Sequence, residues 1–160
     1  MTQADKQTYL ILHNIRSVHN VGSIFRTADA CDINKIYLIG LTPTPTDKFD
    51  RERKDLSKVA LGAEKNIPWE KCPSTPQLIK KLKKEGFLIV SLEQSPKSVD
   101  YKKIKIKQKT AFILGNEVEG ISESILKMSD VVAEIPMRGK KESLNVSVAA
   151  GVMLFRVLGI

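Results

Sequence analysis

The feature that most constrains the fold is a repetition of short apolar runs, each followed by a helical or loop segment. Five such runs, rich in β-branched or other apolar residues, cover residues 9–12, 36–40, 87–92, 111–115 and 131–135. The alternation of strand and helix predicts an α/β protein. Because most of these runs are continuously apolar, we expect a mostly parallel sheet that helices cover on both faces.

The most apolar stretch lies almost at the end of the chain, at residues 143–157 (SLNVSVAAGVMLFRV). From Val146 to Val157 it is apolar nearly all round a helix, so one packing face cannot explain it. We expect one side of this helix to cover the sheet and a second surface to be covered by something else. Ser143, Asn145 or both can accept hydrogen bonds from the first N–H groups of the helix.

Composition excludes several classes of protein. With 160 residues and 42% hydrophobic content, the chain is most simply one domain with one core. No apolar run approaches the roughly 18 residues of a membrane helix, and the N-terminus is not a secretory signal, so we expect a cytoplasmic protein without a membrane partner. Cys31 and Cys72 stand far apart without a CxxC motif or a nearby histidine pair, which argues against a disulfide framework and a metal site.

The charge balance points to a polyanionic partner. The chain has 26 Lys+Arg against 18 Asp+Glu, a formal charge of +8. Residues 42–55 (TPTPTDKFDRERKD) have no hydrophobic period and predict an exposed loop. Residues 75–86 predict an amphipathic helix that ends at Gly86, and residues 101–109 a lysine-rich approach to the next strand. The basic residues of the exposed loop are Lys48, Arg51, Arg53 and Lys54.

Residues 14–30 (NIRSVHNVGSIFRTADA) predict a strand end, a polar loop and a helix from about Val21 to Ala30, with Asn20 as its cap. In an α/β sheet ligands bind at such a strand end, and the free N–H groups of a helix N-terminus suit a phosphate. The alternative to ligand binding is that Asn20 and Ser17 only cap the helix and Arg26 is only solvated, but capping does not need so many polar residues. The candidate ligand-binding residues are Asn14, Arg16, Ser17, Asn20 and Arg26.

Residues 112–122 (FILGNEVEGIS) form a second polar turn after a buried strand. Gly115 and Gly120 have the spacing of a phosphate loop, but Ile121 stands where that motif requires lysine, so a nucleoside triphosphatase is disfavoured. Glu117 or Glu119 can orient an arginine through paired hydrogen bonds, or both can be solvated on a surface turn. The residues alone leave both alternatives open.

The third stretch, residues 135–151 (IPMRGKKESLNVSVAAG), is a basic loop that leads into the closing helix. Capping readily explains one of its two polar residues, Ser143 and Asn145. A cofactor or substrate at the end of a buried strand would use both. Here too, capping alone and ligand binding both remain open.

Together, the three stretches resemble the SpoU/TrmH-type RNA ribose methyltransferases of the SPOUT superfamily, in the same order and at comparable spacing. The matching segments are residues 14–30, LGNEVEGIS (114–122) and IPMRGKKESLNVSVAAGVMLF (135–155), so the likeness covers essentially the whole chain. The resemblance implies an α/β knot: a mostly parallel sheet, helices on both faces and a C-terminal trefoil knot. Connection rules alone would predict an unknotted sheet. The resemblance also implies a homodimer, whose partner would cover the second apolar surface of the closing helix.

The same resemblance implies an S-adenosylmethionine pocket without a metal, built from backbone groups and apolar contacts of Leu92, Gly115, Ile135, Met137 and Leu144. Arg26 matches the arginine at the reacting ribose, and the supporting polar residues are Asn20, Glu117, Ser143 and Asn145. The residues expected to contact RNA are Arg16, Lys48, Arg51, Arg53, Lys54 and Arg138.

The implied reaction moves the methyl group of the sulfonium to a ribose 2′-oxygen held in line with the S–methyl bond. A guanidinium does not ordinarily lose its proton near neutral pH. We therefore expect Arg26 to hold the adjacent phosphate and stabilise the developing alkoxide, while phosphate or water accepts the proton.

Because the chain starts almost at the first motif, we expect a single methyltransferase domain over residues 1–160 without a separate RNA-binding domain. Recognition by the core alone favours a compact RNA such as tRNA over rRNA. The alternatives are a non-catalytic RNA-binding module with the same fold and a methyltransferase that acts on a base. An unrelated nucleotide-binding enzyme is disfavoured because the chain lacks a GxGxxG motif and the phosphate-loop lysine.

Overall fold

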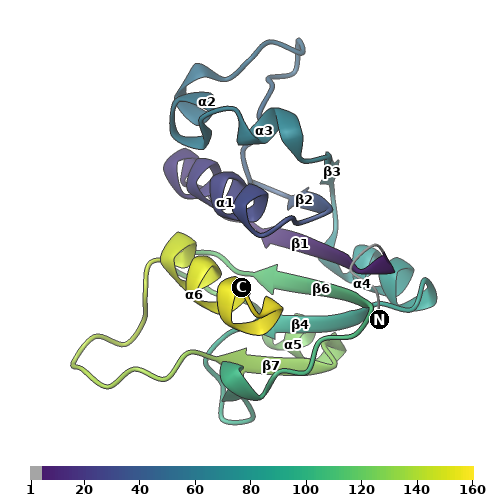
Figure 1. The fold of residues 1–160 in the computed structure, drawn as a ribbon, viewed down its shortest axis with the longest axis vertical. Helices are drawn as coiled ribbons and strands as arrows, with labels where there is room; N and C mark the ends of the chain where they lie inside the picture. Colours follow the sequence, from purple (N-terminus) through teal and green to yellow (C-terminus); the bar gives the residue numbers. More distant parts are fainter. Residues whose placement is uncertain (1–4) are drawn as a thin grey trace.

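The protein is built on one seven-stranded sheet in which every paired strand is parallel, as the computed structural model of residues 5–160 shows (Figure 1). Its strands are β1 (Gln7–His13), β2 (Lys35–Ile39), β3 (Trp69–Cys72), β4 (Leu88–Leu92), β5 (Val99–Asp100), β6 (Lys109–Leu114) and β7 (Val131–Glu134). Their spatial order is β3-β2-β1-β6-β4-β7-β5. The predicted α/β class with a parallel sheet is therefore confirmed.

Each of the five predicted apolar runs lies in a strand, namely β1, β2, β4, β6 or β7. The two strands that the apolar pattern missed, β3 and β5, are the edges of the sheet. Edge strands bury little, and β3 carries two exposed charged residues, Glu70 and Lys71, in a run of four. A continuous apolar run is the signature of a buried strand, so it does not detect these two edges.

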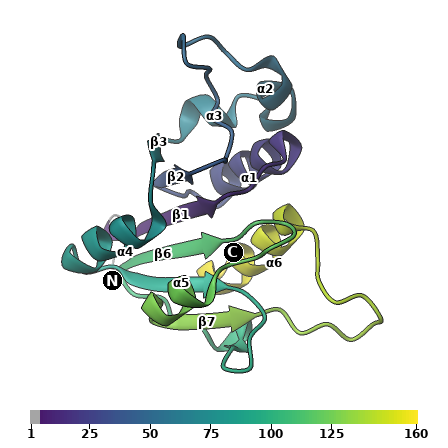
Figure 2. The same cartoon turned by 180° about the vertical axis from the view of Figure 1, so that it is seen from behind.

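Helices cover both faces of the sheet (Figures 1 and 2). On one face lie α1 (Val18–Ala30), α2 (Lys54–Ala60), α3 (Ala63–Asn66) and α6 (Val146–Leu158), with a core that includes Leu10, Leu12, Phe25 and Phe112. On the other face lie α4 (Thr75–Lys84) and α5 (Glu123–Met128), packed on Ile11, Ile39 and Ile113. Alternate residues of β1 thus point into different cores, which is why the run had to be apolar throughout.

The N-terminus of α1 corrects one sequence-based prediction. The helix begins at Val18, and its cap is Ser17, whose Oγ accepts a hydrogen bond from the backbone N–H of Asn20 at 3.1 Å. Asn20 therefore lies inside the first turn and is 7% exposed. Serine and asparagine cap about equally well, so the sequence could not choose between them. The side chain of Asn20 is thereby free for another task.

The other predicted segments agree with the structure in their main features. Helix α4 ends at Lys84, and Gly86 follows with φ +90°, a conformation that favours glycine at a helix end. The 42–55 loop is exposed from Lys48 onward except at Arg53, its first six residues are buried or half-buried, and its last two residues begin α2. The lysine-rich approach to β6 contains a short 3₁₀ helix, η2 (Tyr101–Lys103).

Helix α6 spans Val146–Leu158 and uses only part of its apolar surface within the chain. Ala150, Met153 and Leu154 are fully buried against the core. Val148, Val152 and Phe155 are 51%, 38% and 40% exposed, and their spacing places them on one face. That face is uncovered in the single chain. The trefoil knot implied by the resemblance stays a prediction.

Across residues 5–160, no helix combines the length and apolar character that a bilayer crossing requires.

Candidate active site

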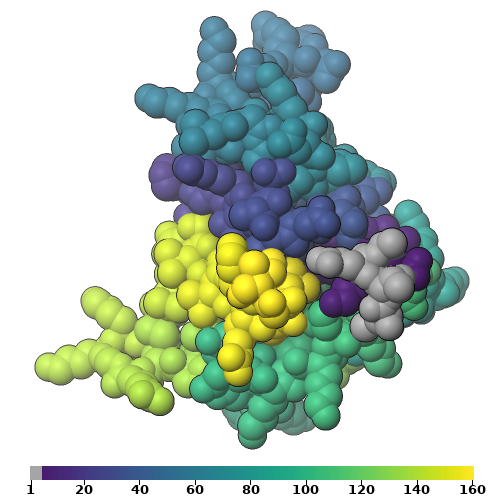
Figure 3. Space-filling view, in the orientation of Figure 1, coloured from purple at the N-terminus to yellow at the C-terminus, as the bar shows by residue number. Residues whose placement is uncertain are grey.

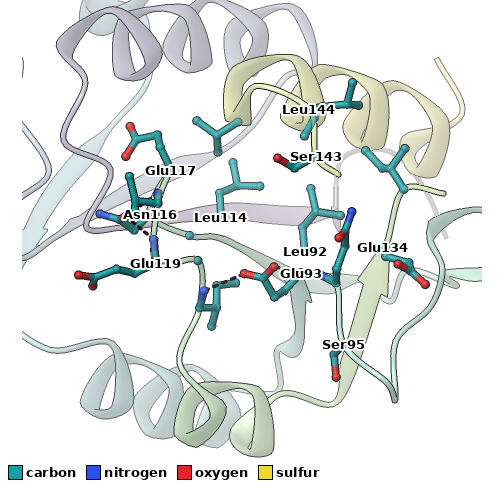
Figure 4. A pocket seen from close by; sticks show the side chains of 18 of the residues that line it. Leu92, Glu93, Ser95, Leu114, Asn116, Glu117, Glu119, Glu134, Ser143 and Leu144 are labelled. Atoms are coloured by element: carbon teal, nitrogen blue, oxygen red, sulfur yellow. Dashed lines mark hydrogen bonds between the residues drawn. The ribbon is translucent and has the colours of Figure 1, made fainter. Parts of the chain in front are cut away.

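A cavity of about 750 Å³ opens where the carboxyl ends of β4, β6 and β7 meet the start of α6 (Figure 4). All five residues expected to contact a cofactor lie on its wall: Leu92, Gly115, Ile135, Met137 and Leu144. Four of the five residues in the predicted catalytic set also line it: Asn20, Glu117, Ser143 and Asn145. The carboxyl ends of parallel strands are where an α/β sheet receives ligands, so the fold explains this convergence.

Hydrogen bonds join the three motif loops at the cavity. The Glu117 carboxylate accepts hydrogen bonds from Ser17 N at 3.2 Å and from Asn20 Nδ2 at 3.3 Å. Asn20 Oδ1 in turn accepts one from Asn145 Nδ2 at 3.1 Å. We call this set, Glu117, Asn20 and Asn145, the polar bridge. It connects side chains that are 97 and 125 residues apart in sequence.

The carboxyl group of Glu117 is held in its ionised form. Partial burial opposes ionisation, but hydrogen bonds from its own backbone N–H, from Ser17 and from Asn20 outweigh burial and lower the pKa of Glu117 below its usual value. Arg16 N adds a longer contact at 3.4 Å. Because the carboxylate can only accept, it fixes the Asn20 amide with its NH₂ toward Glu117 and its oxygen toward Asn145.

Asn145 has two roles, which explains why a polar residue opens so apolar a helix. Its Oδ1 caps α6 by accepting hydrogen bonds from Ser147 N at 2.9 Å and Val148 N at 3.4 Å. Its Nδ2 belongs to the polar bridge. Ser143 lies on the cavity wall and Asn145 is the cap, so the prediction that one or both would cap is confirmed for Asn145.

The loop between β6 and α5 is a tight turn that forms one wall. Asn116 Oδ1 accepts hydrogen bonds from Val118 N at 2.8 Å and Glu119 N at 2.9 Å, while its Nδ2 donates to Asn14 O at 2.8 Å. Gly115 has no room for a side chain, since an added Cβ would lie 2.8 Å from the carbonyl carbon of Gly120. These contacts fold the loop back against the first motif.

Sequence reasoning did not single out several residues of the cavity wall, among them Asn116 and Glu93. Glu93 Oε2 accepts a hydrogen bond from Ile121 N at 2.8 Å, which ties the end of β4 to the β6–α5 loop (Figure 4). Asn116 lay within the quoted motif, and an Asn directly after a glycine could have indicated its turn-forming role. Glu93 follows Leu92 directly, but no local pattern indicated that its side chain crosses to another loop.

The cavity has the opposite charge from the protein as a whole. Five glutamates line it, and no lysine, arginine or histidine is among its described lining residues; the five are Glu93, Glu117, Glu119, Glu123 and Glu134. A smaller hollow of about 490 Å³ adjoins it and shares residues 116–119, with Arg16 and Ser17 on its other side. The larger cavity therefore suits a cationic or neutral ligand. The smaller hollow holds one cation, Arg16, beside the carboxylates of Glu117 and Glu119.

Several predicted residues lie away from the cavity. Arg26 is exposed on α1 and lines neither hollow. Arg138 is exposed on the projecting loop between β7 and α6 (Figure 1). The four basic residues of the 42–55 loop precede or begin α2 and line neither hollow. Two of them are in ion pairs at 2.9 Å, Arg51 with Asp47 and Arg53 with Asp55.

Within residues 5–160, no group of three or more His, Cys, Asp or Glu side chains is arranged to hold a metal ion.

Comparison with known proteins identifies relatives of this chain. The 23S rRNA (guanosine-2'-O-)-methyltransferase RlmB of Neisseria meningitidis serogroup B is 33% identical over 145 residues, which are 91% of this chain and 55% of RlmB. The tRNA (guanosine(18)-2'-O)-methyltransferase of Aquifex aeolicus is 29% identical over 155 residues, 97% of this chain and 70% of the relative. This chain thus spans about half the length of RlmB.

A solved structure agrees with the sequence relatives. The crystal structure of an AdoMet-bound rRNA methyltransferase from Sinorhizobium meliloti matches with a TM-score of 0.83 and 31% identity, over 94% of this chain and 55% of that one. The model of the SpoU rRNA Methylase family matches residues 7–155, from β1 into α6. The resemblance read from the three motifs is confirmed: the chain belongs to the SpoU rRNA methylase family.

Proposed function

We propose that this chain transfers a methyl group from S-adenosylmethionine to a ribose 2′-hydroxyl of a structured RNA. The observation that carries the proposal is the polar bridge, which unites the three motif loops beside one acid-lined cavity. The relatives named above carry 2'-O-methyltransferase names and support the same activity.

The larger cavity fits S-adenosylmethionine in size and in chemistry. Its volume of about 750 Å³ lies within the range of small-molecule sites, about 300 to 1,000 Å³. Leu92, Ile135, Met137 and Leu144 offer apolar contacts to an adenosine, and the surrounding carboxylates suit a ligand with sulfonium and ammonium charges. When bound there, S-adenosylmethionine supplies an electrophilic methyl group. A nucleoside triphosphate would meet five carboxylates and no cation in the same place.

The smaller hollow supports a place for the acceptor nucleotide. It shares residues 116–119 with the larger cavity, so a ligand there would lie next to the methyl donor. Arg16 is exposed at its edge and can hold a phosphate, while the Asn20 and Glu117 side chains orient the groups between the two hollows. Positioning of this kind supplies much of the rate in a transfer reaction.

We also propose that the active protein is a homodimer. The exposed stripe of Val148, Val152 and Phe155 on α6 would be covered by a second copy. Arg26 lines neither hollow of its own chain, so a partner that packs on α1 and α6 can bring its own copy of this arginine to the cavity. There the guanidinium would hold the phosphate next to the reacting ribose and stabilise the alkoxide, and water or phosphate would take the proton.

Mixing two inactive variants tests the shared site. Arg26→Ala and Glu117→Ala subunits, combined at equal amounts, should regain about a quarter of the wild-type activity, because half of the dimers are mixed and each has one intact site. No regain from a mixture shown to contain mixed dimers would mean that Arg26 acts within its own chain. If the wild-type protein sediments as a monomer at assay concentration, the homodimer proposal is wrong.

The activity itself is tested with purified protein, S-adenosylmethionine and either unfractionated tRNA or rRNA. Nuclease digestion and mass spectrometry of the product should find the methyl group on a ribose. A methyl group on a base would support the base-directed alternative, and the absence of S-adenosylmethionine binding in calorimetry would support the non-catalytic RNA-binding module. RNA from cells with and without the gene then identifies the modified nucleotide.

We propose tRNA as the first substrate to assay. The Aquifex aeolicus relative, of which this chain covers 70%, is named for a tRNA guanosine, although RlmB is named for 23S rRNA. A single methyltransferase domain without a separate RNA-binding domain, and a cytoplasmic location, stay predictions from the sequence.

A further inference from the structure

An aromatic side chain stands exposed at the tip of the 42–55 loop. Phe49 is 65% exposed, and its loop belongs to the segment that forms one end of the molecule, at the top of Figure 3. The tip is nevertheless ordered by a narrow hairpin, in which Thr46 and Glu52 form an antiparallel bridge and Asp47 N donates to Arg51 O at 2.8 Å. Phe49 is therefore presented by a defined turn.

The turn does not need the aromatic ring for its own stability. Asp47 Oδ1 accepts hydrogen bonds from the backbone N–H groups of Phe49 at 2.8 Å and Arg51 at 3.0 Å. Asp50 adopts φ +59°, which an aspartate tolerates in a turn. All of these contacts use backbone groups or Asp47, so the hairpin could form with almost any side chain at position 49. A large apolar ring in water then calls for another explanation.

Two cations lie against the ring. The Lys48 ammonium is 5.1 Å from the ring centroid, and the Arg51 guanidinium carbon is 4.9 Å from it. Arg51 is fixed there by its 2.9 Å ion pair with Asp47. Lys48 forms no ion pair among the residues that the structure describes. The ring thus contacts one cation that is paired with Asp47 and a second, Lys48, that has no ion-pair partner among the described residues.

We propose that Phe49 is a stacking platform for an unpaired nucleobase of the RNA. Every base has a π face that can stack on an aromatic ring, and Lys48 is placed to leave the ring and meet the phosphate of the stacked nucleotide. Arg51, held by Asp47, supports the ring from its own position. No residue of the 42–55 loop lines either hollow, so this site contacts a part of the RNA other than the nucleotide at the cavity. This inference rests on the proposed RNA substrate and adds a contact that no motif indicated.

The test measures RNA binding by the full chain with three substitutions at this position and one matched control. Phe49→Ala removes the ring, Phe49→Leu keeps apolar surface without a π face, and Phe49→Trp keeps the π face. Leu61→Ala is the control, since Leu61 is also 65% exposed and directly follows α2. The probes are unfractionated tRNA and a short single-stranded RNA with one fluorescent purine analogue.

We expect Phe49→Ala and Phe49→Leu to weaken the binding of both RNAs by about 5- to 150-fold, the range measured for loss of one base–aromatic stack. Phe49→Trp and Leu61→Ala should bind within about twofold of the wild type. Stacking should also quench the purine fluorescence in the wild type and in Phe49→Trp only. Binding of S-adenosylmethionine should be equal in all variants, which checks folding and the distant cavity.

Wild-type RNA affinity in Phe49→Ala, or in Phe49→Leu, would overturn the proposal. Loss of the dimer in Phe49→Ala would overturn it too, because the ring would then contact a second protein copy. The proposed function fails in a different way, if the wild type binds S-adenosylmethionine and RNA but methylates none. In that case the quenching data still decide whether Phe49 stacks on a base.

Discussion

Substitutions at Asn145 can separate the stability of helix α6 from the function of the polar bridge. The Asn145 side chain caps α6 through its oxygen and donates to Asn20 through its nitrogen. Asn145→Asp keeps an oxygen acceptor for the cap but has no hydrogen to donate to Asn20. If the Asn20 amide turned round to donate to the new carboxylate, its oxygen would face Glu117. The bridge therefore breaks in either orientation.

Asn145→Ala and Asn145→Asp should destabilise the protein by different amounts. Asn145→Ala removes the cap, about 1 kcal/mol, and one bridge hydrogen bond, about 1 kcal/mol more. For a chain of this length that loss lowers the Tm by about 4–8 °C. Asn145→Asp loses only the bridge hydrogen bond and gains a charge at the helix N-terminus that offsets about 0.3–1 kcal/mol. Its Tm should fall by less than half as much.

Activity should not follow stability in this series. We expect both variants to lose about tenfold in kcat/KM, equivalent to about 1.4 kcal/mol, because Asn20 and Glu117 lose their shared orientation. Ser74→Ala is the control: it removes the cap of α4, where Ser74 Oγ accepts from Gln77 N at 3.4 Å, and should lower the Tm but not kcat/KM. Wild-type kcat/KM in Asn145→Asp would refute a functional role for the bridge.

Three further predictions follow from the site. Gly120→Ala should weaken S-adenosylmethionine binding in calorimetry, because φ +66° strains an alanine and the added Cβ would push Glu93 Oε2 from its hydrogen bond with Ile121 N. Gly139→Ala, with open space around it, should bind normally. The pKa of Glu117 is lower in the folded protein than the value of about 4.3 in the unfolded chain, so its carboxylate stabilises the fold above that pH. The Tm of the wild type should therefore exceed that of Glu117→Gln at neutral pH, and the difference should shrink as the pH falls below about 4.3. A Tm difference that does not change with pH would contradict this prediction. Arg26→Lys keeps the charge but loses the planar fork, so near-normal turnover would count against phosphate gripping by Arg26.

The sequence could predict the layers of the fold because apolar runs report burial on both faces of a strand. It could also predict which loops form the site, since Asn20, Glu117 and Asn145 each lie in the segment that follows a strand, and the carboxyl ends of parallel strands meet at one edge. It could not identify Asn20 as a bridge residue, because asparagine beside a helix start is equally typical of a cap. Only the structure shows that Ser17 takes that role.

Other features depend on contacts that no local pattern records. The side chain of Glu93, just after β4, accepts a hydrogen bond from the backbone of Ile121 in the loop after β6, and nothing near Glu93 in sequence specifies that partner. Arg26 belongs to the same motif as Asn20, yet it points to solvent from α1. Sequence proximity within a motif therefore did not imply proximity in the fold.

The place of β6 in the sheet affects how the protein is made. Strand β1, which starts at Gln7, lies between β2 and β6, and Gln7 pairs with Lys109 of β6. During translation, β1 can pair with β2 early, but its other edge stays open until β6 has left the ribosome. Such distant pairing slows folding and exposes strand edges to aggregation. A nascent chain stalled before Lys109 should therefore depend on chaperones far more than the finished protein does.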